Sequence, residues 1–172
     1  MIVLGMRRDK RKIDTGEPFL GSVAVQAGDL TAGELRGPLV KRLFQDVYAA
    51  ARAPDDHELH CAAAALVLPP SAVLTGRSAA TLRGVRLAGP QDPVELVVPE
   101  AVRVFRRFGL RVRRSDLEPE EWVGWRTIGI ATPARMALDL LLERPLTEAV
   151  ADLDAVLRAG LLPRSTLRRC VA

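Results

Sequence analysis

The chain has 172 residues, of which 48% are hydrophobic and only 4% aromatic, so its core must be aliphatic and spread over one or two modest domains. Its formal net charge is +4, and nearly all of its positive charge is arginine, because lysine occurs only at Lys10, Lys12 and Lys41. No run reaches the roughly 20 apolar residues of a membrane span. The two cysteines, Cys61 and Cys170, show no disulfide or metal spacing. We therefore expect a cytoplasmic protein without a membrane partner.

Residues 1–17 show no hydrophobic periodicity and are rich in positive charge. The cations of this segment are Arg7, Arg8, Lys10, Arg11 and Lys12. Two interpretations are open: a basic disordered tail, or a basic arm that lies along the phosphates of a nucleic acid. The segment does not resemble a signal peptide, because its charges follow the first apolar residues instead of preceding them.

Residues 18–54 predict a small domain that is dense in turn and capping signals. We expect a short helix over 18–27, a tight turn, a second helix over 32–36, a basic segment and a strand over 46–50. This order is typical of a compact winged helix-turn-helix. The second helix is short, because Gly37 and Pro38 interrupt it.

Four polar side chains of this small domain are candidates for contact with duplex DNA. Thr31 stands three residues before Glu34, which is the spacing of a capping box at the start of a helix. The expected DNA-binding residues are Thr31, Arg36, Lys41 and Arg42, which would meet phosphates and base edges. The residues fit a second interpretation equally well: a small helical cap packed on the larger domain.

A polar stretch containing Pro54 ends the small domain, and residues 55–172 predict a mixed α+β domain, so the expected fold class is α+β. Before its central helix we expect a helix at 55–66, an extended piece at 72–74, a helix at 78–82, strands at 94–98 and 109–114, and an extended hairpin at 121–131. In the strand at 109–114, Leu110 and Val112 should point inward and Arg111 and Arg113 outward.

The stretch 131–160 predicts two helices, and the first should be the buried centre of the domain, packed against a small sheet. Thr132 is its expected N-cap and Pro133 its first residue. Most of its other positions are apolar, which is typical of a buried helix. Arg135 and Asp139 are four residues apart, so we expect a structural ion pair that orients the helix.

The second helix of this pair follows Pro145, which ends the first. Thr147 is its expected N-cap, and Gly160 is expected to close it.

The densest arginine cluster of the chain predicts a possible second basic surface. Its members are Arg103, Arg106, Arg107, Arg111, Arg113 and Arg114. One interpretation is a second nucleic-acid surface or a docking face for an acidic partner. The other is a solvated strand edge whose charges prevent edge-to-edge pairing.

The sequence lacks the patterns that would predict catalysis. It has no nucleophile elbow, no zinc-protease motif and no phosphate-binding loop, and no lysine follows Lys41 to complete a nuclease site. His57, His60 and Cys61 lie on one predicted helix, but no second group of ligand residues completes a tetrahedral metal site. We expect no enzyme activity, no cofactor and no metal.

Two groups of residues resemble AbiEi-type antitoxins. In the small domain the resemblance rests on Gly28, Leu30-Thr31, Leu35, Arg42-Leu43-Phe44 and Val47-Tyr48. In the large domain it rests on Ala131-Thr132-Pro133-Ala134-Arg135, Asp139, Glu148-Ala149 and Asp154. The same pattern is similar to the leading half of proteins that end in a very-short-patch-repair-like endonuclease, which this sequence lacks.

The resemblance implies a function as well as a fold. It implies a winged-helix domain at 18–54, followed by an antitoxin-like domain at 55–172. It also implies a type IV toxin–antitoxin regulator that binds double-stranded promoter DNA, represses its own operon and counters a nucleotidyltransferase toxin. The alternative is a protein-interaction module, the detached regulatory half of the related endonucleases.

Overall fold

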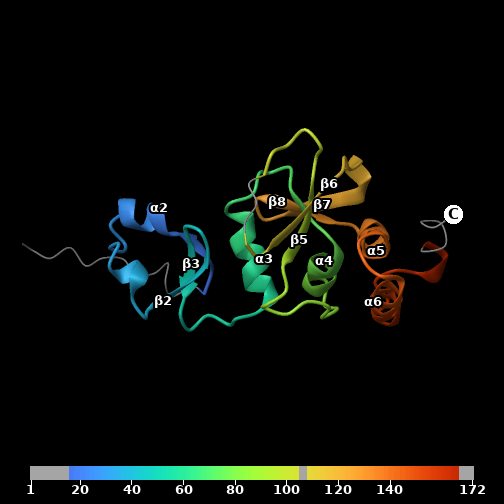
Figure 1. Cartoon of the computed structure of the whole chain (residues 1–172), viewed down its shortest axis with the longest axis horizontal. Coiled ribbons are helices and arrows are strands. Elements are labelled where there is room, and N and C mark those ends of the chain that lie inside the picture. The colour runs from blue at the N-terminus through green and yellow to red at the C-terminus, as the bar shows by residue number, and fades with distance from the viewer. Residues whose placement is uncertain (1–15, 105–107, 167–172) are drawn as a thin grey trace, which may run out of the picture. The chain divides into compact units, whose positions relative to one another are not determined.

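A computed structural model describes residues 16–104 and 108–166 of the chain. The chain divides into two compact units between Asp55 and Asp56, and each unit combines helices with its own β-sheet (Figure 1). The fold is therefore α+β, as the sequence predicts.

The N-terminal unit is a small antiparallel sheet with one short helix. Its described elements are β1 (Phe19–Leu20), α2 (Gly21–Gln26), the 3-10 turn η1 (Glu34–Arg36), β2 (Val40–Phe44) and β3 (Val47–Ala50). The strand order is β1-β3-β2, and both pairings are antiparallel. The core consists of the buried side chains of Phe19, Ala24, Leu30 and Val40, against which Leu35 and Tyr48 pack.

The turn between β2 and β3 holds the start of helix α2. Asp46 has a positive φ of 63°, and its carbonyl oxygen accepts a hydrogen bond from the Gly21 amide at 2.9 Å. Its carboxylate accepts two more, from the Ser22 amide at 2.8 Å and the Ser22 hydroxyl at 2.5 Å. These bonds satisfy amides that a helix start leaves without an intrahelical partner. Gly21 is required here, because a Cβ atom would lie 2.5 Å from the ring of Tyr48.

Two expectations for the N-terminal unit are wrong in detail. The helix expected over 18–27 begins only at Gly21, because Phe19 and Leu20 pair with β3 instead. The helix expected over 32–36 is a single 3-10 turn. The basic segment after it forms strand β2, whereas the strand expected at 46–50 is confirmed as β3.

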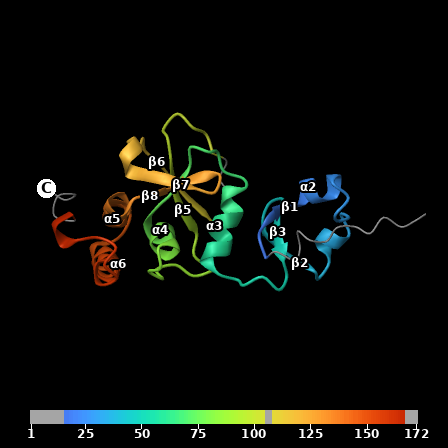
Figure 2. The same ribbon diagram turned by 180° about the vertical axis from the view of Figure 1, so that it is seen from behind.

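The C-terminal unit is a mixed sheet with helices on both sides. Its described elements are α3 (His57–Ala65), β4 (Val73–Leu74), α4 (Gly76–Leu82), β5 (Val94–Val98), β6 (Leu110–Arg114), the 3-10 turn η2 (Pro119–Glu121), β7 (Trp122–Trp125), β8 (Ile128–Ala131), α5 (Pro133–Leu142) and α6 (Leu146–Arg158). The strand order is β6-β5-β4-β8-β7. The β4–β8 and β5–β6 pairs are parallel, and the other two are antiparallel. In both views, α3 lies on one side of the sheet, with α5 and α6 on the other (Figures 1 and 2).

The core of this unit is aliphatic, as the composition predicts. Every residue of β5 is buried, and Leu74 and Leu96 are among the largest fully buried side chains. From α5, Met136 and Leu140 are also fully buried. Alanines 62–65 of α3 let that helix approach its neighbours closely.

The central helix is confirmed as α5. The side chain of Thr132 accepts the Arg135 amide as its N-cap, and Pro133 is the first helical residue. The expected cap of the next helix is wrong: α6 already begins at Leu146, after Pro145, and no side chain caps it. Gly160 adopts a positive φ of 72° just after α6, as a helix-closing glycine does.

Within residues 16–104 and 108–166, no helix combines the length and apolar character that crossing a membrane requires.

Candidate functional site

The four candidate DNA-binding residues differ in how much of each side chain is available for contact with DNA. Thr31 is half-buried, and its hydroxyl completes the predicted capping box, accepting the Glu34 amide at 3.2 Å and donating to Glu34 Oε2 at 2.8 Å. Lys41 is also engaged, because its ammonium donates to the Ala53 carbonyl at 2.8 Å and lies 3.4 Å from Asp55. These two side chains therefore hold the unit together.

Arg36 and Arg42 are cations of the N-terminal unit whose guanidiniums remain available for contact with DNA. Both are exposed. Each donates only its Nε to a nearby backbone carbonyl: Arg36 to Ala32 at 3.1 Å, and Arg42 to Phe44 at 3.2 Å. Among the residues that the structure describes, no carboxylate pairs with either guanidinium. Their terminal nitrogens can therefore reach a phosphate.

The described arginines of the cluster in the C-terminal unit differ in exposure and in partners. Arg103 and Arg114 are exposed, whereas Arg106 and Arg107 lie outside the described residues. Arg111 is exposed, as expected, whereas the outward direction expected for Arg113 is wrong, because its side chain is only 22% exposed. Arg111 pairs with Glu95 at 3.3 Å, and Arg113 pairs with Asp139 and Glu143.

Asp139 is the centre of a buried ionic cluster. Its carboxylate is 1% exposed and accepts from the guanidiniums of Arg135 and Arg113 and from the hydroxyl of Thr75. Arg135, itself 8% exposed, also pairs with Glu121 at 3.1 Å. Burial alone would lower the pKa of Arg135, but the hydrogen bonds and charges of Asp139 and Glu121 outweigh it and raise that pKa. The expected Arg135–Asp139 pair is thus part of a larger network.

A second group of charges extends this network to helices α4 and α6. Arg144 has a side chain only 4% exposed and pairs with both Glu95 and Asp152. Arg77 pairs with Asp152 at 2.7 Å, and its amide donates to Glu95 at 2.8 Å. Gly76 makes room for this contact, because a Cβ atom at its positive φ of 54° would lie 2.2 Å from Glu95 Oε2.

These clusters brace helices and present no obvious acid–base pair. Each carboxylate at their centre is paired with at least one guanidinium. Sequence reasoning found only the Arg135–Asp139 pair, because those residues are one helical turn apart. The Arg77–Asp152 and Arg144–Glu95 pairs join residues 75 and 49 positions apart, and no local pattern signals them.

His57 belongs to a buried hydrogen-bonded chain. Its Nδ1 lies 3.0 Å from the Gly89 carbonyl and its Nε2 2.7 Å from the Ser78 hydroxyl. Because a carbonyl only accepts, Nδ1 carries the proton and Nε2 accepts from Ser78. Burial also raises the pKa of Cys61 to about 12, so this thiol stays protonated. No cluster in the described part of the chain is arranged to hold a metal ion.

The buried imidazole of His57 predicts a loss of stability in mild acid. Burial lowers its pKa below the ordinary value of 6.5, and the weaker effect of the Gly89 hydrogen bond does not restore it. The unfolded chain therefore binds more protons than the folded chain once the pH falls below 6.5, so the free energy of unfolding decreases there.

Urea unfolding between about pH 7.5 and pH 5 measures this effect, because linkage relates the slope to bound protons. In His57→Gln the amide keeps hydrogen-bonding capacity without titrating, so the acid-induced decrease should be smaller than in the wild type. Equal decreases in the two proteins would show that His57 carries none of the effect.

Comparison with known proteins yields a similarity of fold. The sequence matches no family model, and no curated protein matches it. Among solved structures, the chain is similar to the crystal structure of the RV2827C protein from Mycobacterium tuberculosis, with a TM-score of 0.57 and 18% identity. The match covers 90% of this chain and 66% of that chain, so this chain spans about two-thirds of its length. At this identity the likeness concerns the fold alone.

Proposed function

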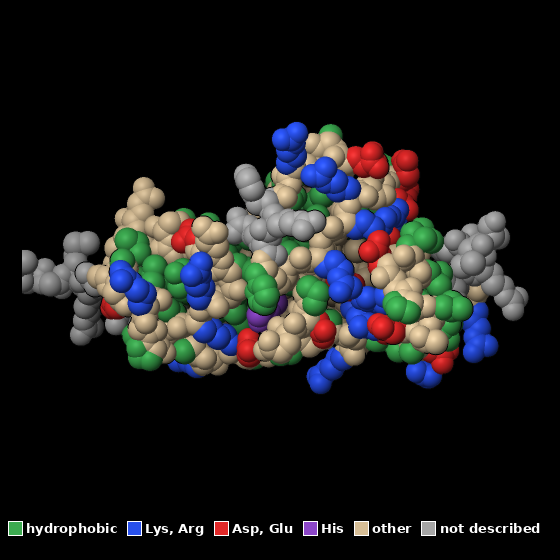
Figure 3. Space-filling view, in the orientation of Figure 1, with side chains coloured by type: hydrophobic (Ala, Val, Ile, Leu, Met, Phe, Trp, Pro, Cys, Tyr) green, Lys and Arg blue, Asp and Glu red, His purple; other side chains and the backbone are tan. Residues whose placement is uncertain are grey.

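We propose that this protein is a non-enzymatic, antitoxin-like regulator whose N-terminal unit binds duplex DNA. The observation that carries the proposal is the pair of exposed guanidiniums, Arg36 and Arg42, which no carboxylate among the described residues neutralises. Arg36 ends the 3-10 turn η1 and Arg42 lies on strand β2 of the hairpin that follows, an arrangement compatible with a compact winged helix. Figure 3 shows Lys and Arg side chains on the visible face of this unit.

The N-terminal unit is better suited to contacts with DNA phosphates than to contacts with many base edges. Between residues 16 and 55 there are four cations, at 36, 41, 42 and 52, and five carboxylates, at 17, 29, 34, 46 and 55. Net attraction to DNA must therefore come from the exposed arginines and from the basic arm at 7–12, which lies outside the described residues. The single turn of η1 offers few positions for contact with base edges.

The antitoxin part of the proposal is supported by the resemblance described above. In that setting the protein represses its own operon, and its C-terminal unit binds a nucleotidyltransferase toxin. The ionic network gives that unit a rigid frame, because it ties β5 and β6 to three helices.

Binding to the DNA upstream of its own gene tests the proposal. Fluorescence anisotropy should detect binding to that duplex, with an affinity at least about 10-fold above that for a scrambled duplex of equal length, because even one or two base contacts contribute about 1–3 kcal/mol each. It should also weaken steeply as salt rises. Equal affinity for both duplexes would argue against a sequence-specific regulator, and no binding to either would remove the DNA function.

The alternative, a protein-interaction module, is favoured by an exposed apolar stripe where α5 meets α6. Leu142, Leu146 and Val150 are 62%, 73% and 54% exposed and follow one another at intervals of four residues. Apolar stripes of this kind mark protein interfaces more often than nucleic-acid surfaces. Stable co-purification with a nuclease or nucleotidyltransferase in the absence of DNA would favour this alternative.

A further inference from the structure

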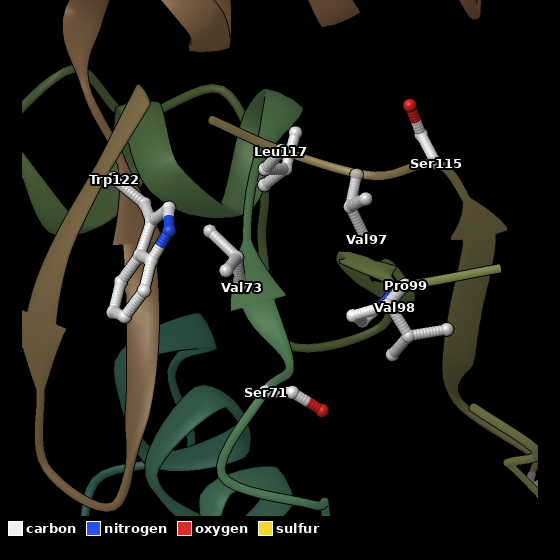
Figure 4. A pocket seen from close by; sticks show the side chains of 8 residues that line it. All are labelled: Ser71, Val73, Val97, Val98, Pro99, Ser115, Leu117 and Trp122. Atoms are coloured by element: carbon white, nitrogen blue, oxygen red, sulfur yellow. The ribbon is translucent and has the colours of Figure 1, made fainter. Parts of the chain in front are cut away.

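The C-terminal unit has a small apolar hollow beside strand β7. Its volume is about 160 Å³, and no residue of a helix lines it. Figure 4 shows the indole of Trp122 along one side, with branched aliphatic side chains next to it and hydroxyl groups toward the ends. The lining residues used below are Val73, Val97, Leu117, Trp122, Ser71 and Ser115.

Trp122 is held in place by the neighbouring strand. A Cβ atom at Gly129 would lie 2.8 Å from the Trp122 ring and 3.0 Å from Val73, so only a glycine lets the indole lie against β8. The side chain nevertheless remains 37% exposed. Trp125 lies three residues further along the same strand, so it points to the opposite face of the sheet.

The exposed residues that stand next to lining residues in the sequence are acidic, although the whole chain is basic, and we call these carboxylates the rim of the hollow. The loop after β6 places Ser115 and Leu117 in the lining, and β7 places Trp122 there, while Asp116, Glu118 and Glu120 are exposed. Glu100 is exposed beside Pro99, and its amide donates to Asp116 at 3.2 Å. No lysine or arginine of the described residues pairs with these four carboxylates. Figure 3 shows acidic side chains gathered over this part of the molecule.

We infer that this hollow binds a basic protein segment that carries one bulky apolar anchor side chain. A cavity of about 150 Å³ can hold a benzene molecule, so this hollow suits a phenylalanine or leucine side chain. A half-exposed tryptophan in an apolar pocket is a typical binding hot spot. The carboxylate rim supplies attraction for lysine or arginine residues beside the anchor and repels nucleic acid. This surface is therefore distinct from the proposed DNA-binding unit.

Synthetic peptides test the inference without any DNA, so its failure is distinguishable from failure of the DNA proposal. The probe is a dye-labelled heptapeptide with a central phenylalanine flanked by arginines and lysines. One control peptide has serine in place of phenylalanine, and a second has glutamate in place of each basic residue. In full-length Trp125→Phe protein, Trp122 is the sole tryptophan and reports occupation by its fluorescence.

The basic phenylalanine peptide should bind at least about 10-fold more tightly than either control peptide and should change Trp122 fluorescence. Trp122→Ala should weaken its binding by at least about 10-fold, whereas Trp125→Ala, which alters the same hairpin on its other face, should not. Glu100→Lys combined with Glu120→Lys replaces no lining residue and should weaken binding about 10-fold at low salt, with a smaller difference at high salt.

Glu58→Lys combined with Asp154→Lys is the matched charge control, because both are exposed carboxylates of helices, α3 and α6, and neither lines the hollow. Equal affinity for the three peptides would overturn the inference, as would binding that is insensitive to both the Trp122 and the Glu100/Glu120 variants. Absence of binding at a peptide concentration of about 1 mM would overturn it as well.

Discussion

Replacing Asp139 by alanine is expected to lower the free energy of unfolding by about 3–5 kcal/mol, the usual cost of removing one partner from a buried ion pair. The Asp139 carboxylate is 1% exposed and is contacted by two guanidiniums and one hydroxyl. Its loss leaves Arg135, 8% exposed, with Glu121 as its remaining described carboxylate partner. Urea unfolding followed by circular dichroism measures the change.

Asp154→Ala is the matched control for this prediction. Asp154 also pairs with an arginine four residues away on its helix, Arg158, but the two side chains are 58% and 71% exposed. An exposed pair of this kind contributes about 0.5 kcal/mol or less, because water and salt screen it. If Asp139→Ala cost no more than Asp154→Ala, the network would not brace the C-terminal unit as described.

The double variant Arg36→Ala/Arg42→Ala is expected to lose about 10- to 100-fold in affinity for duplex DNA at low salt, since each lost phosphate contact removes favourable counterion release. For the same reason, the slope of log K against log salt should become less steep by about two. Both guanidiniums are exposed and bound only through Nε, so their removal should leave the fold unchanged. Anisotropy titrations at several salt concentrations give both quantities.

The control for this variant removes two exposed arginines from the other unit. Arg86→Ala/Arg158→Ala changes the net charge of the chain by the same amount. If the two double variants weakened DNA binding equally, the attraction would depend on overall charge and not on a surface of the N-terminal unit.

Much of the fold follows from local signals. Thr132 and Pro133 set the start of α5, and a run of branched residues sets β5, so both elements are predictable from neighbours in the sequence. The strand Phe19–Leu20 is different, because it exists only through pairing with Val47 and Tyr48. A two-residue strand has no periodicity of its own, so the pattern of the surrounding stretch predicts a helix there instead.

The candidate site was harder to predict than the fold. Arg36 and Arg42 could be proposed from type and position, but only the structure shows that Lys41 is committed to the Ala53 carbonyl. Likewise, the alternation of Arg111 and Arg113 indicates a common face, but not which one. Their partners Glu95 and Asp139 come from distant elements, so the sequence offers no signal for either ion pair.

Hydrogen exchange of the full chain with and without the DNA upstream of its gene tests the central claim most directly. The account predicts that DNA slows exchange of backbone amides in 31–36 and 40–50, around η1 and the β2–β3 hairpin, while amides of 56–166 change little. Protection confined to the C-terminal unit, or no protection in either unit at saturating DNA, would contradict the account.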